Sequence, residues 1–365
     1  MPADTTNPTS SPLAIAAEIV LPCADLNATL AFFVERLGFR VDAISPADDP
    51  STAVISAYGV RARLQRGSAG APGVLRLLCH DPAAFAGGAI ELVAPNGTRI
   101  EIADADPPLV LPPIAASFVL TRANDGAWIE GRAGMRYRDL VPDRQAGRVI
   151  ASHIQIPNGG PVPDYVHFHK VRFQMIFCKK GWVKVVYEDQ GPPFVLHAGD
   201  CVLQPPQIRH RVLESSPGLE VIELGSPAHH ETFADHDMQL PTANVRPDRR
   251  FGEQRFVRHE AASATWRPWR HEGFEVRDTG LAAATNGVGG AGVVRALRTA
   301  SARMTTHDAE LVFAFVLRGA ITLRREGHTD ERLAEGDSFV IPAATRYALD
   351  DAADLELLDV TLPAR

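Results

Sequence analysis

Cysteine is scarce in this sequence, and its few positions form no recognisable framework. Four cysteines occur in 365 residues, and none lies in a Cys-x-x-Cys pair. They are Cys23, Cys79, Cys178 and Cys201. Small secreted domains that depend on disulfides carry closely spaced cysteines in larger numbers. The composition therefore argues against a disulfide framework and favours the reducing cytoplasm as the location.

Long apolar runs and an excess of positive charge are also missing. No apolar run approaches the roughly 20 residues that cross a bilayer. The net charge of −7 and the isoelectric point of about 6.0 argue against nucleic acid or an anionic membrane as the main partner. The sequence also has no Ser-His-Asp order, glycine-rich phosphate loop or nucleotide motif. We therefore expect a small-molecule substrate.

The first residues differ in composition from the rest. MPADTTNPTSSP is rich in proline, serine and threonine, and it lacks the basic and apolar regions of a signal peptide. We expect a disordered tail over residues 1–12. The chain as a whole is long enough for two or three domains, and its hydrophobic content of 45% supports real cores.

Residues 13–104 combine one helical pattern with several strand patterns. Ala14–Leu21 alternates as a strand does, and Asp25 then caps a helix, LNATLAFFVERLG, that ends at Gly38. Asn96-Gly97 is typical of a hairpin turn. The strands predicted after the helix are FRVDAIS, TAVISAYG, ARLQRG, GVLRLLCH, AIELVAP and TRIEIAD.

This β-α-β-β-β order, with LGF after the helix and PNGTRIEI at the end, resembles a glyoxalase or vicinal-oxygen-chelate module. The resemblance implies metal-ligand positions in the first and last strands, which here are Glu18 and Glu101. A complete site in that family needs two modules, and the sequence shows one. Either two chains pair through this domain or the site is vestigial, with both glutamates solvated or ion-paired. We favour a role in homodimer formation or in covering a substrate.

A proline-rich linker is predicted over residues 105–117, where DADPPLVLPPIAA contains two Pro-Pro pairs. Beyond it the sequence repeats itself at an offset of 137 to 139 residues. The matching landmarks are Trp128 with Trp266, GMRYRD with GFEVRD, Gly181 with Gly319, Gly199-Asp200 with Gly336-Asp337, and Pro205 with Pro342. The repeat predicts two similar domains, 118–240 and 241–365, joined by PTANVRPDRR.

Histidines gather in the first repeat. His167 and His169 are two residues apart in a strand pattern, so both imidazoles face the same way. Gln174 returns to that face if the chain turns near residues 170–172 and a new antiparallel strand follows. His210 ends a predicted strand that begins at Gly199-Asp200. Three imidazoles and an amide that converge in a β-barrel would form a ligand set for a divalent metal.

The order His-x-His-x4-Gln-x6-Gly, followed by Gly-x5-Pro-x4-His, resembles the two motifs of the cupin superfamily. The matching residues are His167, His169, Gln174, Gly181, Gly199, Pro205 and His210. The resemblance implies a mainly β chain with two jelly-roll barrels of six to eight strands, the first holding Fe, Mn, Ni or Zn. Cupins usually carry Glu at the position of Gln174, which therefore either coordinates the metal or hydrogen-bonds to bound water or substrate.

The repeat predicts that the second barrel has lost this chemistry. At the same offsets His167 becomes Thr305, His169 becomes His307, Gln174 becomes Val312 and His210 becomes Tyr347. A single imidazole does not hold a divalent ion tightly against water, so the second barrel is expected to be structural. The segment SPAHHETFADHD, which contains His229, His230 and His236, is expected to form a surface connection after the first barrel.

Three functions remain open. Three-histidine cupins include many non-haem Fe(II) dioxygenases, so the leading hypothesis is a dioxygenase that acts on a small bidentate aromatic, dicarbonyl or hydroxy-acid substrate, with Fe(II) favoured over Mn, Ni or Zn. The second is a redox-neutral lyase, isomerase or hydrolase that uses the metal as a Lewis acid. The third is a non-catalytic binding protein with a structural metal.

Overall fold

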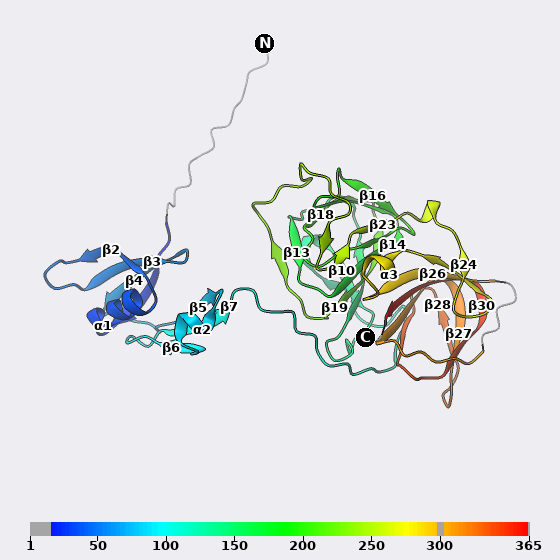
Figure 1. Ribbon diagram of the computed structural model, residues 1–365, viewed down its shortest axis with the longest axis horizontal. Helices are drawn as coiled ribbons and strands as arrows, with labels where there is room; N and C mark the ends of the chain where they lie inside the picture. Colours follow the sequence, from blue (N-terminus) through cyan, green and yellow to red (C-terminus); the bar gives the residue numbers. More distant parts are fainter. Residues whose placement is uncertain (1–15, 298–302, 364–365) are drawn as a thin grey trace, which may run out of the picture. The chain divides into compact units, whose positions relative to one another are not determined.

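The computed structural model describes residues 16–297 and 303–363, so the tail predicted over residues 1–12 lies outside the described residues. The chain divides into two compact units, Met1–Pro108 and Leu109–Arg365 (Figure 1). In the described ranges, every helix is too short or too polar to cross a lipid bilayer. Residues 107–118, within or next to the predicted linker, form neither helix nor strand.

The first half of the N-terminal unit has the predicted elements. Its four-stranded sheet has the order β1-β4-β3-β2, with β1 parallel to β4. The helix is capped as expected, because the Asp25 side chain accepts a hydrogen bond from the Ala28 amide. Its second part is a π-helical turn. The elements are β1 (Ile19–Cys23), α1 (Leu26–Ala31), η1 (Phe32–Arg36), β2 (Arg40–Ser45), β3 (Thr52–Ala57) and β4 (Val60–Arg66).

The second half repeats this arrangement in shortened form, whereas the sequence had indicated one module only. Its sheet has the order β5-β7-β6, with β5 parallel to β7, and α2 follows β5 as α1 follows β1. The helix α2 was not predicted, although Asp81 and Pro82 provide its N-cap and first turn. The elements are β5 (Val74–Cys79), α2 (Pro82–Ala86), β6 (Glu91–Val93) and β7 (Arg99–Asp104).

The first barrel of the C-terminal unit consists of two sheets. One has the order β23-β17-β14-β19-β11-β10-β9, and the other has the order β16-β15-β18-β13-β20 with β12 paired to β18. The elements are β9 (Ile129–Glu130), η2 (Arg132–Gly134), β10 (Arg136–Asp139), β11 (Ile150–Ile156), β12 (Gly160–Pro161), β13 (His167–His169), β14 (Phe173–Lys180), β15 (Trp182–Tyr187), β16 (Phe194–His197), β17 (Cys201–Leu203), β18 (His210–Ser215), β19 (Leu219–Ser226), β20 (Thr232–Ala234) and β23 (Val257–His259).

The second barrel is built around one eight-stranded sheet of order β24-β25-β26-β30-β27-β29-β8, with β28 paired to β27. Its two longest strands, β27 and β30, pair along most of their length and shift register at several points. The elements are β8 (Val119–Thr121), β21 (Arg250–Phe251), β22 (Gln254–Arg255), η3 (Ala261–Ser263), β24 (Arg267–Pro268), β25 (Phe274–Asp278), α3 (Leu281–Ala284), β26 (Gly290–Ala296), β27 (Leu311–Arg325), β28 (Glu331–Ala334), β29 (Ser338–Ile341) and β30 (Tyr347–Leu362).

The two barrels exchange one strand each. β8 precedes the first barrel in the chain but pairs with β29 of the second, and β23 lies in the second half of the repeat but pairs with β17 of the first. The two exchanged strands occupy equivalent positions in the repeat. Neither predicted range, 118–240 or 241–365, therefore contains all the strands of one barrel.

The Gly-Asp landmarks of the repeat lie at this junction between the barrels. Asp200 Oδ1 accepts a hydrogen bond from the Ala261 amide at 2.8 Å, and Asp337 Oδ1 accepts one from the Ala123 amide at 2.7 Å. One apolar core, which includes Phe173 of the first barrel, also continues into the second. The landmarks found in the sequence thus mark reciprocal contacts that hold the two barrels together.

A buried ion cluster adds a further link. Glu310 of the second half accepts hydrogen bonds from Arg148 and Arg172 of the first, at 2.5 and 2.8 Å. Burial raises the pKa of Glu310, but the hydrogen bonds and charges of the two arginines outweigh it, so the pKa lies below its ordinary value. Arg172 is only 5% exposed, so its charge depends on this partner.

We predict that Glu310→Gln destabilises the C-terminal unit by about 3 kcal/mol, because it leaves the Arg172 charge buried without a counter-ion. Urea denaturation followed by circular dichroism measures the change. Glu326→Gln is a matched control, since the Arg346–Glu326 pair is exposed on both sides, and it should change the free energy of unfolding by less than about 0.5 kcal/mol. Equal effects of the two substitutions would contradict this role for Glu310.

The same pair of proteins should show a pH dependence of known sign. Because folding lowers the pKa of Glu310, its stabilising contribution is present above the ordinary value of 4.5 and is lost as the pH falls through the folded value. The stability difference between wild type and Glu310→Gln should therefore shrink as the pH falls below 4.5. A difference that stays constant down to about pH 3 would contradict the prediction.

Candidate metal centre

The three predicted histidines meet inside the first barrel. His167 and His169 lie on β13, and His167 is paired in register with His210 of the neighbouring strand β18. Their exposed fractions are 1%, 8% and 5%, respectively. One expectation was wrong, because His210 begins β18 and does not end the strand that starts near Gly199. Pro205 and Pro206 separate the two strands, since proline cannot donate to a sheet.

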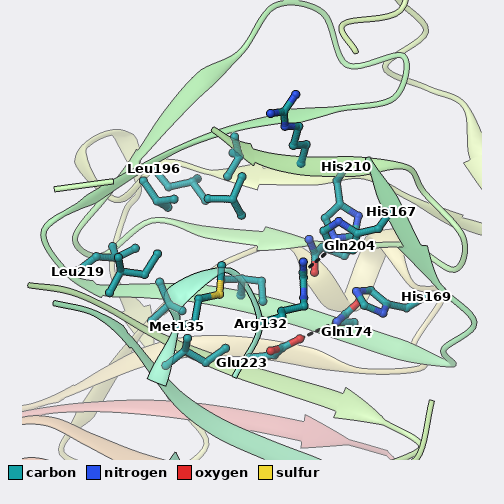
Figure 2. Close-up of a pocket in the computed structure, with 18 of the residues that line it drawn as sticks. Arg132, Met135, His167, His169, Gln174, Leu196, Gln204, His210, Leu219 and Glu223 are labelled. Carbon is teal, nitrogen blue, oxygen red and sulfur yellow. Dashed lines mark hydrogen bonds between the residues drawn. The ribbon is translucent and has the colours of Figure 1, made fainter. Parts of the chain in front are cut away.

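Gln174 joins this cluster from the facing sheet. The chain turns after β13 as predicted, but the strand that follows, β14, pairs with β17 and β19 and not with β13. Gln174 therefore lines the same cavity as the histidines because it points inward from the opposite wall. It is 2% exposed. Figure 2 shows the four side chains together at one end of the pocket.

Each imidazole is oriented through its Nδ1 atom. The hydrogen-bond partners are the backbone oxygens of Tyr165 at 2.8 Å for His167, of Glu231 at 3.2 Å for His169, and of Ile208 at 3.0 Å for His210. A carbonyl oxygen only accepts, so Nδ1 is the donor in all three rings. In the neutral rings, every Nε2 atom therefore carries the lone pair of the ring.

The surroundings keep these rings neutral. Burial lowers the pKa of His169 to about 3, with further lowering by the neighbouring His167 and His230. Burial also lowers the pKa of His210 well below its ordinary value. The pKa of His167 is lowered by burial and, as the next largest effect, by the charge of Arg132. Neutral imidazoles are the form that binds metal ions.

The geometry and chemistry of these donors fit a divalent transition metal. One ring nitrogen from each histidine lies within 4.8 Å of the other two. Each ring is fixed by a backbone partner, as in known histidine metal sites. Within residues 16–297 and 303–363, this is the single cluster of three or more histidine, cysteine or carboxylate side chains with such spacing.

Arg132 lies directly beside the histidines. Its Nη2 atom is 2.7 Å from Nε2 of His167, and its Nη1 atom donates to Oδ1 of Asp164 at 2.5 Å. The Asp164 side chain is completely buried and also accepts from the Val212 amide at 2.9 Å. The guanidinium group is thus anchored at one end, while its other end occupies the lone pair of a candidate metal ligand.

Glu223 fixes the orientation of Gln174. Nε2 of Gln174 donates to Oε1 of Glu223 at 2.6 Å. Because a carboxylate only accepts hydrogen bonds, the amide nitrogen of Gln174 must face Glu223, and its Oε1 atom faces away from Glu223. The amide oxygen is therefore free for a further partner in the pocket. Neither Glu223 nor Arg132 was predicted from the sequence.

Apolar side chains form most of the rest of the pocket, which has a volume of about 90 Å³ and is also lined by Tyr137 and Arg211. Nε2 of Gln204 donates to the Tyr187 hydroxyl at 2.9 Å, so this second amide is already engaged within the wall. The space suits an ion with several waters or a compact organic molecule. The apolar lining consists of Met135, Ile154, Ile156, Ile176, Val183, Val185, Leu196, Val212, Leu219 and Val221.

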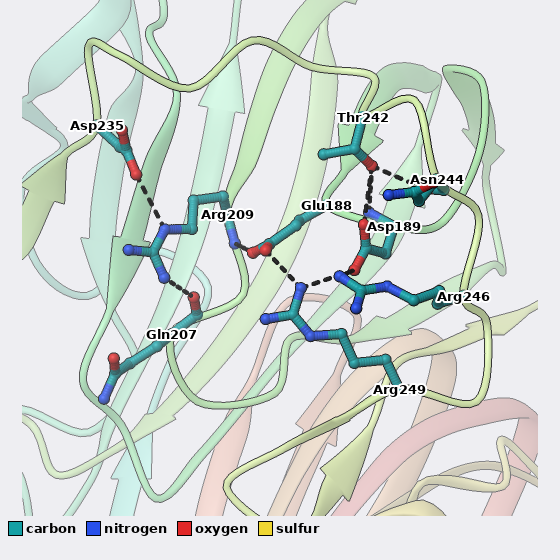
Figure 3. A network of polar contacts seen from close by, with 9 residues as sticks. All are labelled: Glu188, Asp189, Gln207, Arg209, Asp235, Thr242, Asn244, Arg246 and Arg249. Atoms are coloured by element: carbon teal, nitrogen blue, oxygen red, sulfur yellow. Dashed lines mark hydrogen bonds and ion pairs between the residues drawn. The ribbon is translucent and has the colours of Figure 1, made fainter.

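The segment of residues 235–249 follows β20 and is tied to the barrel by a polar network (Figure 3). Arg249 Nη1 donates to Glu188 Oε1 at 2.5 Å and to Asp189 Oδ2 at 2.7 Å, and Arg246 also donates to Asp189. At its beginning, Asp235 accepts from Arg209 at 3.1 Å. These contacts fix the end of β20, which pairs with β13 and so supports the strand that carries two of the histidines.

The segment SPAHHETFADHD, residues 226–237, is more than the surface connection that was expected. The His230 ring lies 5.4 Å from the His169 ring, centroid to centroid, and its Nδ1 donates to the Pro227 oxygen at 2.8 Å. The next residue, Glu231, supplies the carbonyl that orients His169. His236 contacts Tyr165 at a centroid distance of 5.8 Å. This segment therefore belongs to the surroundings of the histidine cluster.

The second barrel preserves the register but not the donors. Thr305 pairs with Tyr347 in an isolated bridge, as His167 pairs with His210 in the first barrel. Tyr347 is 2% exposed and belongs to the apolar cluster of that barrel. His307 Nε2 is bonded to the Ile341 oxygen at 3.0 Å. The register thus agrees with the correspondence drawn from the repeat.

Glu18 directly precedes β1, outside the strand in which it was expected, and Glu101 lies on β7 of the other sheet of the N-terminal unit. The two carboxylate oxygens of Glu18 accept from Arg61 at 2.9 Å and Arg63 at 2.7 Å. The hydrogen bond from Arg61 is the largest influence that lowers the pKa of Glu18. Glu101 lies 3.5 Å from Arg99. Both glutamates are therefore ion-paired here, and a metal role for them stays a prediction.

The residues that the sequence missed had weak signals. Asp164 lies three residues before His167, inside the segment that carried the motif. Arg132 has a counterpart in Arg270 at the offset of the repeat, and the β-sheet register places Asp359 at the position equivalent to Glu223. Extending the repeat from landmarks to charged residues would have selected Arg132.

No family model matches this sequence, and no curated protein matches it. Solved structures do. An oxalate decarboxylase from Lactobacillus farciminis, in a formate complex, has a TM-score of 0.52 at 14% identity over 69% of this chain and 89% of that chain. The protein YlbA from E. coli has a TM-score of 0.51 at 11% identity, over 69% and 92% of the two chains.

A third structure, the Bacillus subtilis oxalate decarboxylase OxdC, was solved in a study of its Mn(II) centres. It has a TM-score of 0.50 at 13% identity, over 71% of this chain and 79% of that chain. Identities this low show the fold alone. The C-terminal unit of this chain therefore shares the fold of these structures.

Proposed function

We propose that the first barrel binds one divalent transition metal through His167, His169 and His210, and that the protein is a metal-dependent enzyme acting on a small anionic molecule. The observation that carries the proposal is the common orientation of the three rings. All three donate through Nδ1 to backbone oxygens, which leaves three lone pairs in one buried place. The metal-dependent oxalate decarboxylases with the same fold support it.

Gln174 is proposed as a fourth ligand through its Oε1 atom. The support is the hydrogen bond that turns its amide nitrogen towards Glu223. A neutral donor set of this kind leaves the full charge of the ion for a bound anion and leaves coordination positions open. When bound, the ion would supply a Lewis acid and a template for a bidentate anion, and Fe(II) would add reactivity towards O2.

The protein's own groups would prepare this reaction. The apolar walls limit water around the polar end of the pocket, which strengthens electrostatic interactions there. The leading reaction class is oxidative cleavage of a small bidentate substrate by a non-haem Fe(II) dioxygenase. The feature that favours it is a cluster of candidate ligands made of three imidazoles and no carboxylate.

A redox-neutral reaction is the second candidate. Two of the structures with the same fold are oxalate decarboxylases, one of them with Mn(II) centres. A lyase of this type would need the ion only as a Lewis acid. Glu223, a carboxylate in the same pocket, provides a group that could exchange a proton with the substrate.

We predict that His169→Ala removes most of the bound metal from the purified protein, because two imidazoles and an amide are a poor ligand set. The matched control is His307→Ala, which changes the equivalent residue of the second barrel and should retain wild-type metal content. Elemental analysis of freshly purified protein measures both. Stoichiometric metal in the His169→Ala protein would place the site elsewhere.

We predict that Glu223→Gln weakens metal binding by about tenfold. The glutamine amide can donate as well as accept, so it no longer holds the nitrogen of Gln174 towards itself and the amide oxygen towards the pocket. Competition with a chromogenic chelator gives the affinity. Gln174→Ala should weaken binding by a similar factor, and the double variant should be no weaker than either single one. Independent, additive losses would mean that Glu223 does not act through Gln174.

The two reaction classes differ in their need for O2. We expect the Fe(II)-loaded protein to consume O2 with one member of a panel of catechols, hydroxybenzoates, diketones and hydroxy acids. An oxygen electrode measures uptake, and chromatography identifies the product. Turnover without O2 in the Mn(II)- or Zn(II)-loaded protein would instead support the redox-neutral lyase.

A further inference from the structure

Arg132 is placed where it would meet any ligand of the metal. Its Nη2 atom bonds to Nε2 of His167, the lone pair that the metal would use. Once the metal takes that lone pair, this N–H group has no acceptor. A guanidinium ion and a divalent cation would then face one another across a few ångströms in a buried pocket, where like charges repel strongly. An anion between them relieves the repulsion.

The second barrel, which lacks the histidine cluster, shows a different pairing of the equivalent arginine. Arg270, the counterpart of Arg132, forms two hydrogen bonds of 2.6 Å with Asp359. Asp359 corresponds in register to Glu223, because Gln174 pairs with Gly225 and Val312 with Thr361. In the first barrel Glu223 is instead bonded to Gln174. The pairing seen in the second barrel is therefore absent from the first, and Nη2 of Arg132 contacts His167 in its place.

The buried Asp164 holds the other end of Arg132 in place. Its carboxylate accepts from Nη1, while the Val212 amide fixes its second oxygen. A guanidinium group positioned in this way presents its remaining N–H groups in a planar fork, which matches a carboxylate. An arginine held by a buried carboxylate in this way is better suited to bind a ligand than a mobile, solvent-exposed arginine.

The opposite part of the pocket selects for a hydrocarbon group. Met135, Ile154, Ile156, Val185, Leu196 and Val221 line it. The pocket volume of about 90 Å³ restricts the hydrocarbon to a compact group. A small dianion with no hydrocarbon part would leave this wall in contact with water or empty, which is unfavourable.

From these observations we propose that the substrate is a monocarboxylate with a compact branched or cyclic hydrocarbon body, and that Arg132 is the residue that recognises its carboxylate beside the metal. This deepens the proposed function and rests on the metal centre being present. The carboxylate would lie between the metal and Nη2 of Arg132, with the hydrocarbon against the apolar wall.

The test uses the full-length protein loaded with Co(II), whose visible spectrum reports on ligand binding without turnover. The probes are 2-hydroxy-3-methylbutanoate, its neutral amide and glycolate. Wild type should bind the first at least about tenfold more tightly than the amide, from the lost charge-assisted hydrogen bond. It should also prefer it to glycolate by at least about tenfold, from the lost apolar burial.

Arg132→Met should lose at least about tenfold in affinity for the carboxylate and keep its affinity for the amide. It should also bind Co(II) at least as tightly as wild type when no carboxylate is present, because a competing cation has been removed from His167. Arg346→Met is the control, since the Arg346–Glu326 pair is exposed on both sides, and it should match wild type within about twofold. Arg211 lines the same pocket and its Nε atom is buried without a hydrogen-bond partner, so Arg211→Met tests the competing assignment. Arg132→Lys, which keeps the charge but not the fork, should be intermediate.

The outcomes separate the two proposals. Loss of Co(II) binding in Arg132→Met, with Arg132→Lys also defective, would mean a structural role and would overturn recognition. Unchanged carboxylate affinity in a Co(II)-loaded Arg132→Met protein would overturn it as well, and so would a loss seen only in Arg211→Met. Tighter binding of glycolate would overturn the hydrocarbon body. Failure of wild type to take up Co(II) would overturn the metal centre and this inference together.

Discussion

The arrangement of the first barrel depends on one kind of interaction, the hydrogen bond from an imidazole Nδ1 to a backbone oxygen. Three such bonds fix three rings, and each acceptor belongs to a different part of the chain, at Tyr165, Ile208 and Glu231. Backbone oxygens do not change identity with a substitution, so the orientation of the rings is a property of the sheet and its connections. Desolvation then keeps the rings neutral, and neutrality is what makes them ligands.

Sequence patterns were sufficient for the histidines because short-range periodicity governs them. Alternation on a strand placed His167 and His169 on one face, and the cupin-like spacing selected His210. The same reasoning failed for the strand that carries His210, because the Pro205-Pro206 pair breaks it. It also failed for the pairing of β14, because alternation says which face a residue uses but not which sheet its strand joins.

Arg132, Asp164 and Glu223 were harder to predict. They come together through sheet topology, and single charged residues carry no periodic signal. The exchange of β8 and β23 was equally out of reach, since either strand is compatible with pairing inside its own half. By contrast, the repeat itself was visible, and the paired register of Thr305 with Tyr347 follows it. The second barrel retains the strand register, but its equivalent positions carry the Arg270–Asp359 pair and the buried Tyr347.

The strand exchange also bears on how the chain matures and how it can evolve. During synthesis, the sheet opposite β13 lacks its edge strand until residues 257–259 have left the ribosome, so the half that carries the three histidines remains incomplete while the other half is being made. A gene fragment that ends after the first repeat would encode the ligands without their full enclosure. Deleting the second half of the repeat would therefore also remove a strand from the first barrel.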